Sequence, residues 1–235
     1  VEGQITMGGI FATYFALTFQ HTWPSGVLLP VMCVAAAIGG GLWGMLPAVF
    51  RAKWGTNETL FTLMLNYIAI GIVKYLQGGP WEKVPKGTQM IERFSQTARM
   101  PNIWGVTVGG LLVLALVIFM FCYLRYTKHG YQIAVVGESE ATARYAGIRV
   151  GQVIIRTMFV SGAIAGIVGF IVVSGINYTL SDSVAGGVGF TGITVAWLAQ
   201  LNPVGMVFIS LLLAVLTKGA STINTLTHNA LPESM

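Results

Sequence analysis

Long uncharged stretches alternate with short charged ones along this chain. No Lys, Arg, Asp or Glu occurs between Glu2 and Arg51. Further uncharged runs span 59–73, 100–124, 157–181 and 183–217. A bilayer core about 30 Å thick requires roughly 20 mainly apolar residues in each helix that crosses it. Because several of these runs reach that length, the pattern predicts an all-α polytopic membrane protein.

The apolar runs predict about six transmembrane helices, of which the last is broken. The expected segments are 5–19, 27–50, 58–76, 104–123, 153–174 and 193–216. Asn202-Pro203 interrupts the last segment, since proline lacks an amide donor and disfavours helix in the residue before it. The glycines at 39–41, and Gly162 and Gly166 at a GxxxG spacing, predict close approach of neighbouring helices. The tail 221–235 is polar and predicts no further span.

The composition narrows the class of protein further. Of the 235 residues, 54% are hydrophobic and 9% are charged, with a mean hydropathy of +0.73. A soluble domain usually carries about 25% charged residues, so a soluble enzyme or nucleic-acid-binding domain is excluded. The net charge of +5 lies mostly in the short connections, and no basic run interleaves with aromatics. The expected partner surface is therefore a lipid membrane and not nucleic acid.

The charged connections also predict which loops share a side of the membrane. Because helices alternate in direction, the connections 51–57 and 125–152 share one side, and 77–102 lies on the other. The first side holds seven Lys or Arg residues and the second holds five. Positive charge favours the cytoplasm, so we expect 125–152 to be a cytoplasmic loop and 77–102 an extracytoplasmic one.

Motifs for catalysis or metal binding are absent from the sequence. The three histidines are far apart and have no metal-ligand spacing, and neither Cys33 nor Cys122 belongs to a metal or redox motif. No Walker A pattern is present. A G-x-G-x-x-G at 187–192 lacks the preceding strand and the acidic residue about 20 positions later that a dinucleotide site requires. We therefore expect a non-enzymatic chain that binds no cofactor itself.

Polar residues within the segment 58–76 have two interpretations. Thr62 and Asn66 lie four residues apart, on one face of the expected helix, one turn beyond Glu58. Intramembrane polar residues tend to face a bundle interior or a transport pathway. The alternative is an interhelical hydrogen bond that serves packing alone. The residues by themselves do not decide between the two.

A second polar feature occupies the loop 125–152. The run 140–146 predicts a short helix, with Ser139 as a capping residue at its start and Gly147 at its end. It is too short to cross a membrane. It is suited either to enter a groove on another protein or to lie on the membrane surface as an amphipathic connector.

The run GESEATARYAGI at 137–148 resembles the cytoplasmic coupling segment of ABC-importer permeases of the branched-chain amino acid, ribose and nucleoside group. Further stretches agree with this resemblance, namely VEGQ at 1–4, TNET at 56–59, TLMLNYI at 62–68, GFTGITVA at 189–196 and Asn-Pro at 202–203. Together they are most similar to the nucleoside (simple-sugar) uptake permeases. Members of that group have further helices at both ends, so we expect 1–235 to be a single permease domain that lacks flanking helices.

This resemblance implies an ATP-driven importer in a prokaryotic plasma membrane, working by alternating access. The implied partners are two ABC ATPase subunits that bind ATP and Mg, a second permease subunit, expected to be a different chain, and a substrate-binding lipoprotein. The residues implied to contact the ATPase are Glu138, Ser139, Glu140, Ala141, Thr142, Ala143, Arg144, Tyr145, Ala146 and Gly147. Gln4, Glu58 and Asn66 are the candidates for the substrate pathway or for packing beside it.

Other functions remain open at the level of sequence. A permease for ribose or another simple sugar would show the same motifs. A passive channel or facilitator would explain the spans, but it gives no reason for the segment 137–148. A membrane enzyme would need paired carboxylates or histidines at membrane depth, and only Glu58 lies near the edge of a span.

Overall fold

A computed structural model describes residues 1–83, 90–103 and 106–226, which form two units, Val1–Gly187 and the part of the chain from Val188 onward. The first unit contains the helices α1 (Glu2–Phe19), α2 (Ser25–Trp54), α3 (Glu58–Gln77), α4 (Val108–Tyr126), α5 (Lys128–Glu138), α6 (Glu140–Tyr145) and α7 (Val150–Ile171). It also contains a 3₁₀ turn, η1 (Gln96–Ala98), a π-helical continuation of α7, η2 (Val172–Asn177), and the short strands β1 (Asn102–Ile103) and β2 (Val106–Thr107). The second unit contains α8 (Val188–Leu198) and α9 (Pro203–Leu226).

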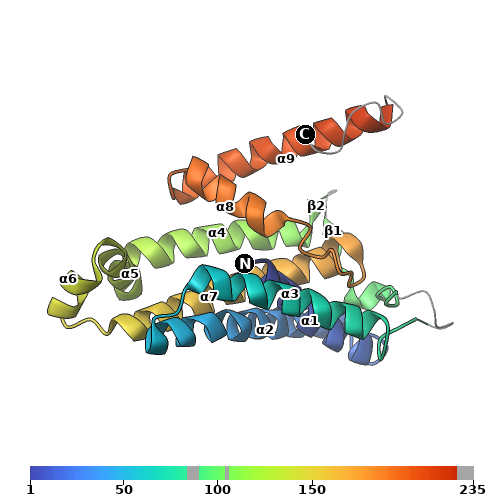
Figure 1. Ribbon diagram of the computed structural model, residues 1–235. Helices are drawn as coiled ribbons and strands as arrows, with labels where there is room; N and C mark the ends of the chain where they lie inside the picture. Colours follow the sequence, from blue (N-terminus) through green and yellow to red (C-terminus); the bar gives the residue numbers. More distant parts are fainter. Residues whose placement is uncertain (84–89, 104–105, 227–235) are drawn as a thin grey trace. The chain divides into compact units, whose positions relative to one another are not determined.

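The predicted all-α membrane architecture is confirmed. Among the described residues, five helices are long and apolar enough to cross a membrane: α2, α3, α4, α7 continued by η2, and α9. The first expected segment, 5–19, corresponds to α1, which is not among these five helices and packs against α2, α3 and α7 (Figure 1). The predicted break is present, because α8 ends at Leu198 and α9 begins at Pro203.

Several boundaries differ from the sequence prediction by a few residues; α8, for example, begins at Val188 instead of residue 193. The fourth span begins at Val108 instead of residue 104, because β1 and β2 form an antiparallel pair in which Asn102 faces Thr107. Residues 104–105, where the span was expected to begin, lie outside the described residues. Helix α9 continues to Leu226 and so includes the beginning of the segment that was expected to be a polar tail.

Glycines allow the backbones of α1, α2 and α7 to touch. A Cβ atom added to Gly166 of α7 would lie 2.1 Å from the carbonyl oxygen of Ala36 on α2, and one added to Gly8 of α1 would lie 2.3 Å from Gly166 Cα. A Cβ on Gly40 would lie 2.4 Å from the carbonyl oxygen of Gly162. All three separations are far below van der Waals contact. The close helix approach predicted from these glycines is confirmed.

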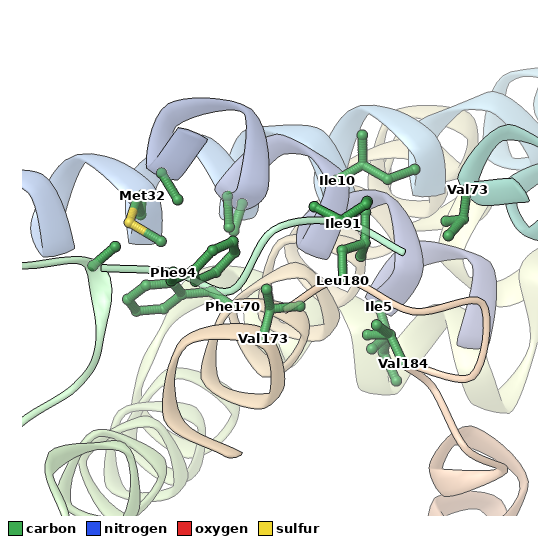
Figure 2. Close-up of a cluster of buried hydrophobic side chains, with 14 of the residues drawn as sticks. Ile5, Ile10, Met32, Val73, Ile91, Phe94, Phe170, Val173, Leu180 and Val184 are labelled. Atoms are coloured by element: carbon green, nitrogen blue, oxygen red, sulfur yellow. The ribbon is translucent and has the colours of Figure 1, made fainter. Parts of the chain in front are cut away.

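The described part of the stretch 77–102 folds over one end of this bundle. Figure 2 shows Phe94 beside Phe170 of α7 and Ile91 beside Leu180, all within the buried cluster. Phe94 is 0% exposed, and its amide donates to the carbonyl oxygen of Tyr178 at 2.9 Å. These residues therefore form part of the core, although they come from a predominantly polar segment.

The π-helix η2 supplies partners for this end cap. The amide of Met100 donates to the carbonyl oxygen of Ser174 (3.1 Å), and the Ser174 hydroxyl donates to the carbonyl oxygen of Ala98 (2.6 Å). From α1, Gln20 accepts a hydrogen bond from the amide of Ser95 through Oε1 (2.9 Å). A π-helical turn changes the register of the backbone hydrogen bonds. Here Ser174 of η2, the π-helical continuation of α7, both accepts a hydrogen bond from the end cap and donates one to it.

The opposite end of the bundle carries the α2–α3 turn together with α5 and α6 (Figure 1). Helix α2 ends at Gly55, which adopts a left-handed conformation (φ 64°). Asn57 then caps α3, since its Oδ1 accepts from the amides of Thr59 and Leu60. The turn 51–57 and the loop 125–152 thus lie at the same end, away from the cap. Their location in the cytoplasm stays a prediction.

Candidate functional site

The short helix α6 is defined at both ends by its own capping residues. The Ser139 Oγ accepts a hydrogen bond from the amide of Thr142 (3.3 Å), as an N-cap side chain does. At the other end, Gly147 has a φ of 76°. The amides of Ile148 and Gly147 donate to the carbonyl oxygens of Ala143 and Arg144 (both 3.0 Å), which is the Schellman pattern. The local sequence therefore fixes this helix at six residues.

The coupling residues expected from the sequence divide into an exposed face and one buried position. Ala143 is 0% exposed, whereas Tyr145 is 95% exposed. The other exposed members are Glu138, Glu140, Ala141, Thr142, Arg144, Ala146 and Gly147, and Ser139 is half-buried at the cap. Ala143 thus faces the body of the first unit, and the remaining residues of α6 form the surface that a partner can reach.

A chain of alternating charges joins α6 to the α2–α3 turn. The guanidinium of Arg51, in the last turn of α2, forms an ion pair with Glu58 at the start of α3 through Nη1. Its Nη2 lies 3.9 Å from Oε1 of Glu140, the first residue of α6. The other carboxylate oxygen of Glu140 lies 3.8 Å from Nη2 of Arg144. Glu58 therefore lies beside α6, at the end of the bundle.

An open cavity of about 600 Å³ lies between these elements. Its lining combines the α2–α3 turn, α6 and the first turns of α7, and includes Arg51, Thr56, Glu58, Glu140, Arg144 and Gly151. Both Arg51 and Glu140, which form the ion pair between α2 and α6, border this cavity. The site is thus a polar groove at the end of the helices.

Gln4 and Asn66 lie in a different place, around Gly3 of α1. Gln4 is 6% exposed, and its Nε2 lies 2.7 Å from the position that a Cβ on Gly44 would occupy. A Cβ on Gly3 would lie 3.2 Å both from Asn66 Cα and from Trp43 Nε1. The structure therefore brings Gln4 and Asn66 into one neighbourhood, and it places Glu58 outside it.

This neighbourhood contains polar atoms without hydrogen-bond partners. Within the described residues, Gln4 Oε1, Trp43 Nε1 and Asn66 Oδ1 are buried and accept or donate no hydrogen bond. A cavity of about 10 Å³ lies beside them, lined by Gln4, Trp43 and Thr62 among others, which is close to the space that one water molecule needs. The sequence analysis missed Trp43, whose only signal was a polar ring atom within a glycine-rich span.

Comparison with known proteins gives three relatives of similar identity. The chain is 30% identical to the glucose ABC transporter permease protein TsgB13 of Haloferax volcanii, covering 94% of this chain and 61% of that protein. It is 31% identical to the guanosine ABC transporter permease protein NupP of Bacillus subtilis and 30% identical to the nucleoside ABC transporter permease protein NupB of Lactococcus lactis, covering 94% of this chain and 64% of each relative.

The chain thus spans somewhat under two thirds of the length of these curated relatives. No solved structure matches it. The match to a family is more extensive, because residues 1–232 fit the family described as the branched-chain amino acid transport system / permease component. The chain therefore belongs to this family of ABC transporter permeases.

Proposed function

We propose that the chain is part of the transmembrane permease subunit of an ATP-driven ABC importer. The observation that carries this proposal is α6, a capped helix of six residues whose exposed face lies at one end of the helix bundle. The chain that forms this bundle belongs to a family of transport permeases. ATP and Mg bind to separate ATPase subunits, which dock on the exposed face of α6. The expected further partners are a second, different permease chain and a substrate-binding lipoprotein.

In this mechanism, closure of the ATPase dimer moves α6 and shifts the permease between inward-open and outward-open states. ATP drives the shift only if it binds one state more tightly than the other, because equal affinity for both would shift nothing. The docking end is the cytoplasmic end, in agreement with the excess of Lys and Arg on that side.

The proposed substrate is a nucleoside. Two relatives at 30–31% identity are named as guanosine and nucleoside permeases. Gln4, Trp43 and Asn66 carry buried amide and indole atoms of the kind that bind hydroxyl groups and base edges. The cavity of about 10 Å³ beside Gln4 and Trp43 must widen in another state of the permease for these atoms to reach a nucleoside. A simple sugar is the second candidate, because the relative at 30% identity from Haloferax volcanii is named as a glucose permease.

The docking of the ATPase is tested by two substitutions on the exposed face of α6, Ala141→Arg and Tyr145→Ala. Each is introduced into the permease in complex with its ATPase and partner subunits. We expect capture of the ATPase and ATP-dependent uptake of tritiated guanosine to fall about five- to thirtyfold, since losing an interface anchor, or placing a bulky charged side chain in the interface, costs roughly 1–2 kcal/mol.

The matched control is Ala134→Arg, the same change at an exposed position of the neighbouring helix α5. We expect it to leave capture unchanged. Full capture of the ATPase by both α6 variants would contradict the proposed docking face. Uptake that continues without ATP would instead favour a passive facilitator.

A further inference from the structure

We propose that Arg51 is a positioning residue that transmits the movement of α6 to the transmembrane helices, an inference that rests on the proposed function. The guanidinium of Arg51 joins a carboxylate of α3 and a carboxylate of α6. Movement of α6 therefore displaces the end of the α2–α3 hairpin through Glu140 and Arg51. Neither residue is required to touch the substrate.

The chemistry of arginine suits a bridge between two carboxylates. Its planar guanidinium carries donors on separate nitrogens, so that it can hold two partners in a fixed geometry, which a lysine ammonium cannot do in the same way. In this structure Nη1 faces Glu58 and Nη2 faces Glu140. Arg144 completes the chain on the far side of Glu140, so the charges alternate along the whole contact.

Other attachments of α6 to the bundle are few. Its backbone hydrogen bonds remain within residues 135–148, and Ala143 is the buried side chain of the helix. Helix α6 packs against α5 and α7, its neighbours in the chain. Among the described residues, Arg51 and Glu140 form the ion pair that joins α6 to α2.

Helix α2 is well placed to carry a displacement into the bundle. Arg51 lies in its last turn, just before the left-handed Gly55, at the end of a helix of 30 residues. Pro47, one turn before Arg51, removes one backbone hydrogen bond there, so a pull on the side chain acts first on this last turn of the helix. The same helix lies against the backbone of α7 at Gly40 and Gly44, and the side chain of Gln4 from α1 also lies against Gly44. Close-packed interfaces of this kind move between discrete arrangements and do not deform continuously.

The pair contributes little to stability, which makes its proposed role testable. The side chains of Arg51, Glu58 and Glu140 are all partly exposed, and partly exposed ion pairs are weak because solvent screens them. Removing Arg51 should therefore leave the fold and the docking of the ATPase intact, while it uncouples the movement of α2 from that of α6.

The test measures the movement of α2 directly and needs no knowledge of the substrate. Spin labels are placed at Trp54→Cys and Tyr126→Cys, two exposed positions at this end of α2 and α4, after Cys33 and Cys122 have been replaced by alanine. The distance between the labels is measured by electron paramagnetic resonance in the complex with the ATPase, with and without a non-hydrolysable ATP analogue.

We expect the analogue to shift the distance between the labels in the otherwise unchanged protein. Arg51→Gln should reduce the shift by at least about half, while ATPase capture stays within about twofold of the parent. Arg51→Lys should restore part of the shift. Glu58→Gln, a second variant that removes one end of the bridge, should reduce the shift in distance less.

The matched control is Lys53→Gln. Lys53 is a cation on the same turn of α2, beside Trp54, and it faces no carboxylate among the described residues.

The possible outcomes separate this inference from the proposed function. An unchanged shift in both Arg51→Gln and Glu58→Gln, an equal loss in Lys53→Gln, or no shift in the parent would each overturn the role of Arg51. Loss of ATPase capture in Arg51→Gln would also overturn it, since Arg51 would then serve docking itself. If Ala141→Arg and Tyr145→Ala fail to reduce capture, the proposed docking of the ATPase fails instead.

Discussion

Ala143 and Tyr145 lie two positions apart on α6 but face opposite surroundings. Ala143 is buried against the bundle, whereas Tyr145 is almost fully exposed. The sequence predicted this helix through its capping residues, Ser139 and Gly147. It did not predict the buried face, because six residues are too few to show a hydrophobic period. An Ala143 substitution therefore tests the packing of α6, whereas Ala141 and Tyr145 test its exposed surface.

The residues around Gly3 were also predicted only in part from the sequence. Gln4 and Asn66 were expected beside a pathway or in packing, and the structure places both near Gly3. Trp43 could not be predicted as the third member, since its place depends on how closely α1 approaches α2 and α3. That approach is set by the packing of glycines that are distant in sequence.

We expect Asn66→Leu to change which compounds compete for uptake and to leave the stability nearly unchanged. The buried Oδ1 of Asn66 has no hydrogen-bond partner among the described residues, so leucine removes no protein hydrogen bond of this atom. A lost hydrogen bond to a substrate costs about 0.5–1.5 kcal/mol, or roughly two- to tenfold in apparent affinity. The measurement is competition between guanosine and glucose for uptake, with the melting temperature in detergent recorded alongside.

The control for this prediction is Gln152→Leu, which removes an exposed amide at the start of α7. We expect it to leave the competition unaltered. A lower melting temperature of Asn66→Leu with unaltered competition would instead assign Asn66 to helix packing.

At the scale of elements, the helices were predictable and their end structures were not. The charged residues and glycines at the helix ends gave the boundaries of α2 and α3 to within a few residues, and Asn202-Pro203 gave the break before α9. The cap formed by 90–101 was not foreseen. Its hydrogen bonds reach Gln20 and the π-helix η2. A local sequence pattern does not indicate hydrogen-bond partners that lie more than 70 residues away.

The contact of α1, α2 and α7 gives a prediction at this scale. Gly166→Ala should lower the free energy of unfolding by about 1–3 kcal/mol, because the added methyl group meets the backbone of α2 and overpacking of a core is destabilising by about this amount. The measurement is the melting temperature of the purified protein in detergent. Gly71→Ala is the matched control, since a Cβ at Gly71 of α3 meets nothing within 4 Å; an equal loss in both variants would contradict the argument.

At the scale of the first unit, the two ends of the bundle have different constructions. One end is closed by a cap of hydrogen bonds and buried aromatic side chains. The other carries partly exposed charges and a polar groove of about 600 Å³. The alternation of spans predicted that 51–57 and 125–152 would share an end and that 77–102 would lie opposite, and the described residues are arranged in this way. Sequence alone indicated this arrangement because it follows from the number and direction of the spans.

This arrangement predicts the reactivity of single cysteines. Trp54→Cys and Tyr145→Cys should react with a membrane-impermeant maleimide from the cytoplasmic side, and Met90→Cys should react from the outside, since all three positions are exposed and the reagent does not cross hydrocarbon. The experiment compares intact cells with inside-out vesicles, on a background in which Cys33 and Cys122 are alanine. Labelling of all three positions from one side would contradict the arrangement.

The central place of α1 has a consequence for biogenesis. Among the long helices of the described residues, α1 is the one that is not apolar enough to count as a candidate span, and its polar side chains Gln4, Thr6 and Thr13 are buried. One of these neighbours, α7, is synthesised long after α1, with several spans in between. Lipid alone is a poor solvent for such a helix. We therefore expect the packing of α1 to be completed only after α7 has been synthesised, because α1 contacts α7 as well as α2 and α3.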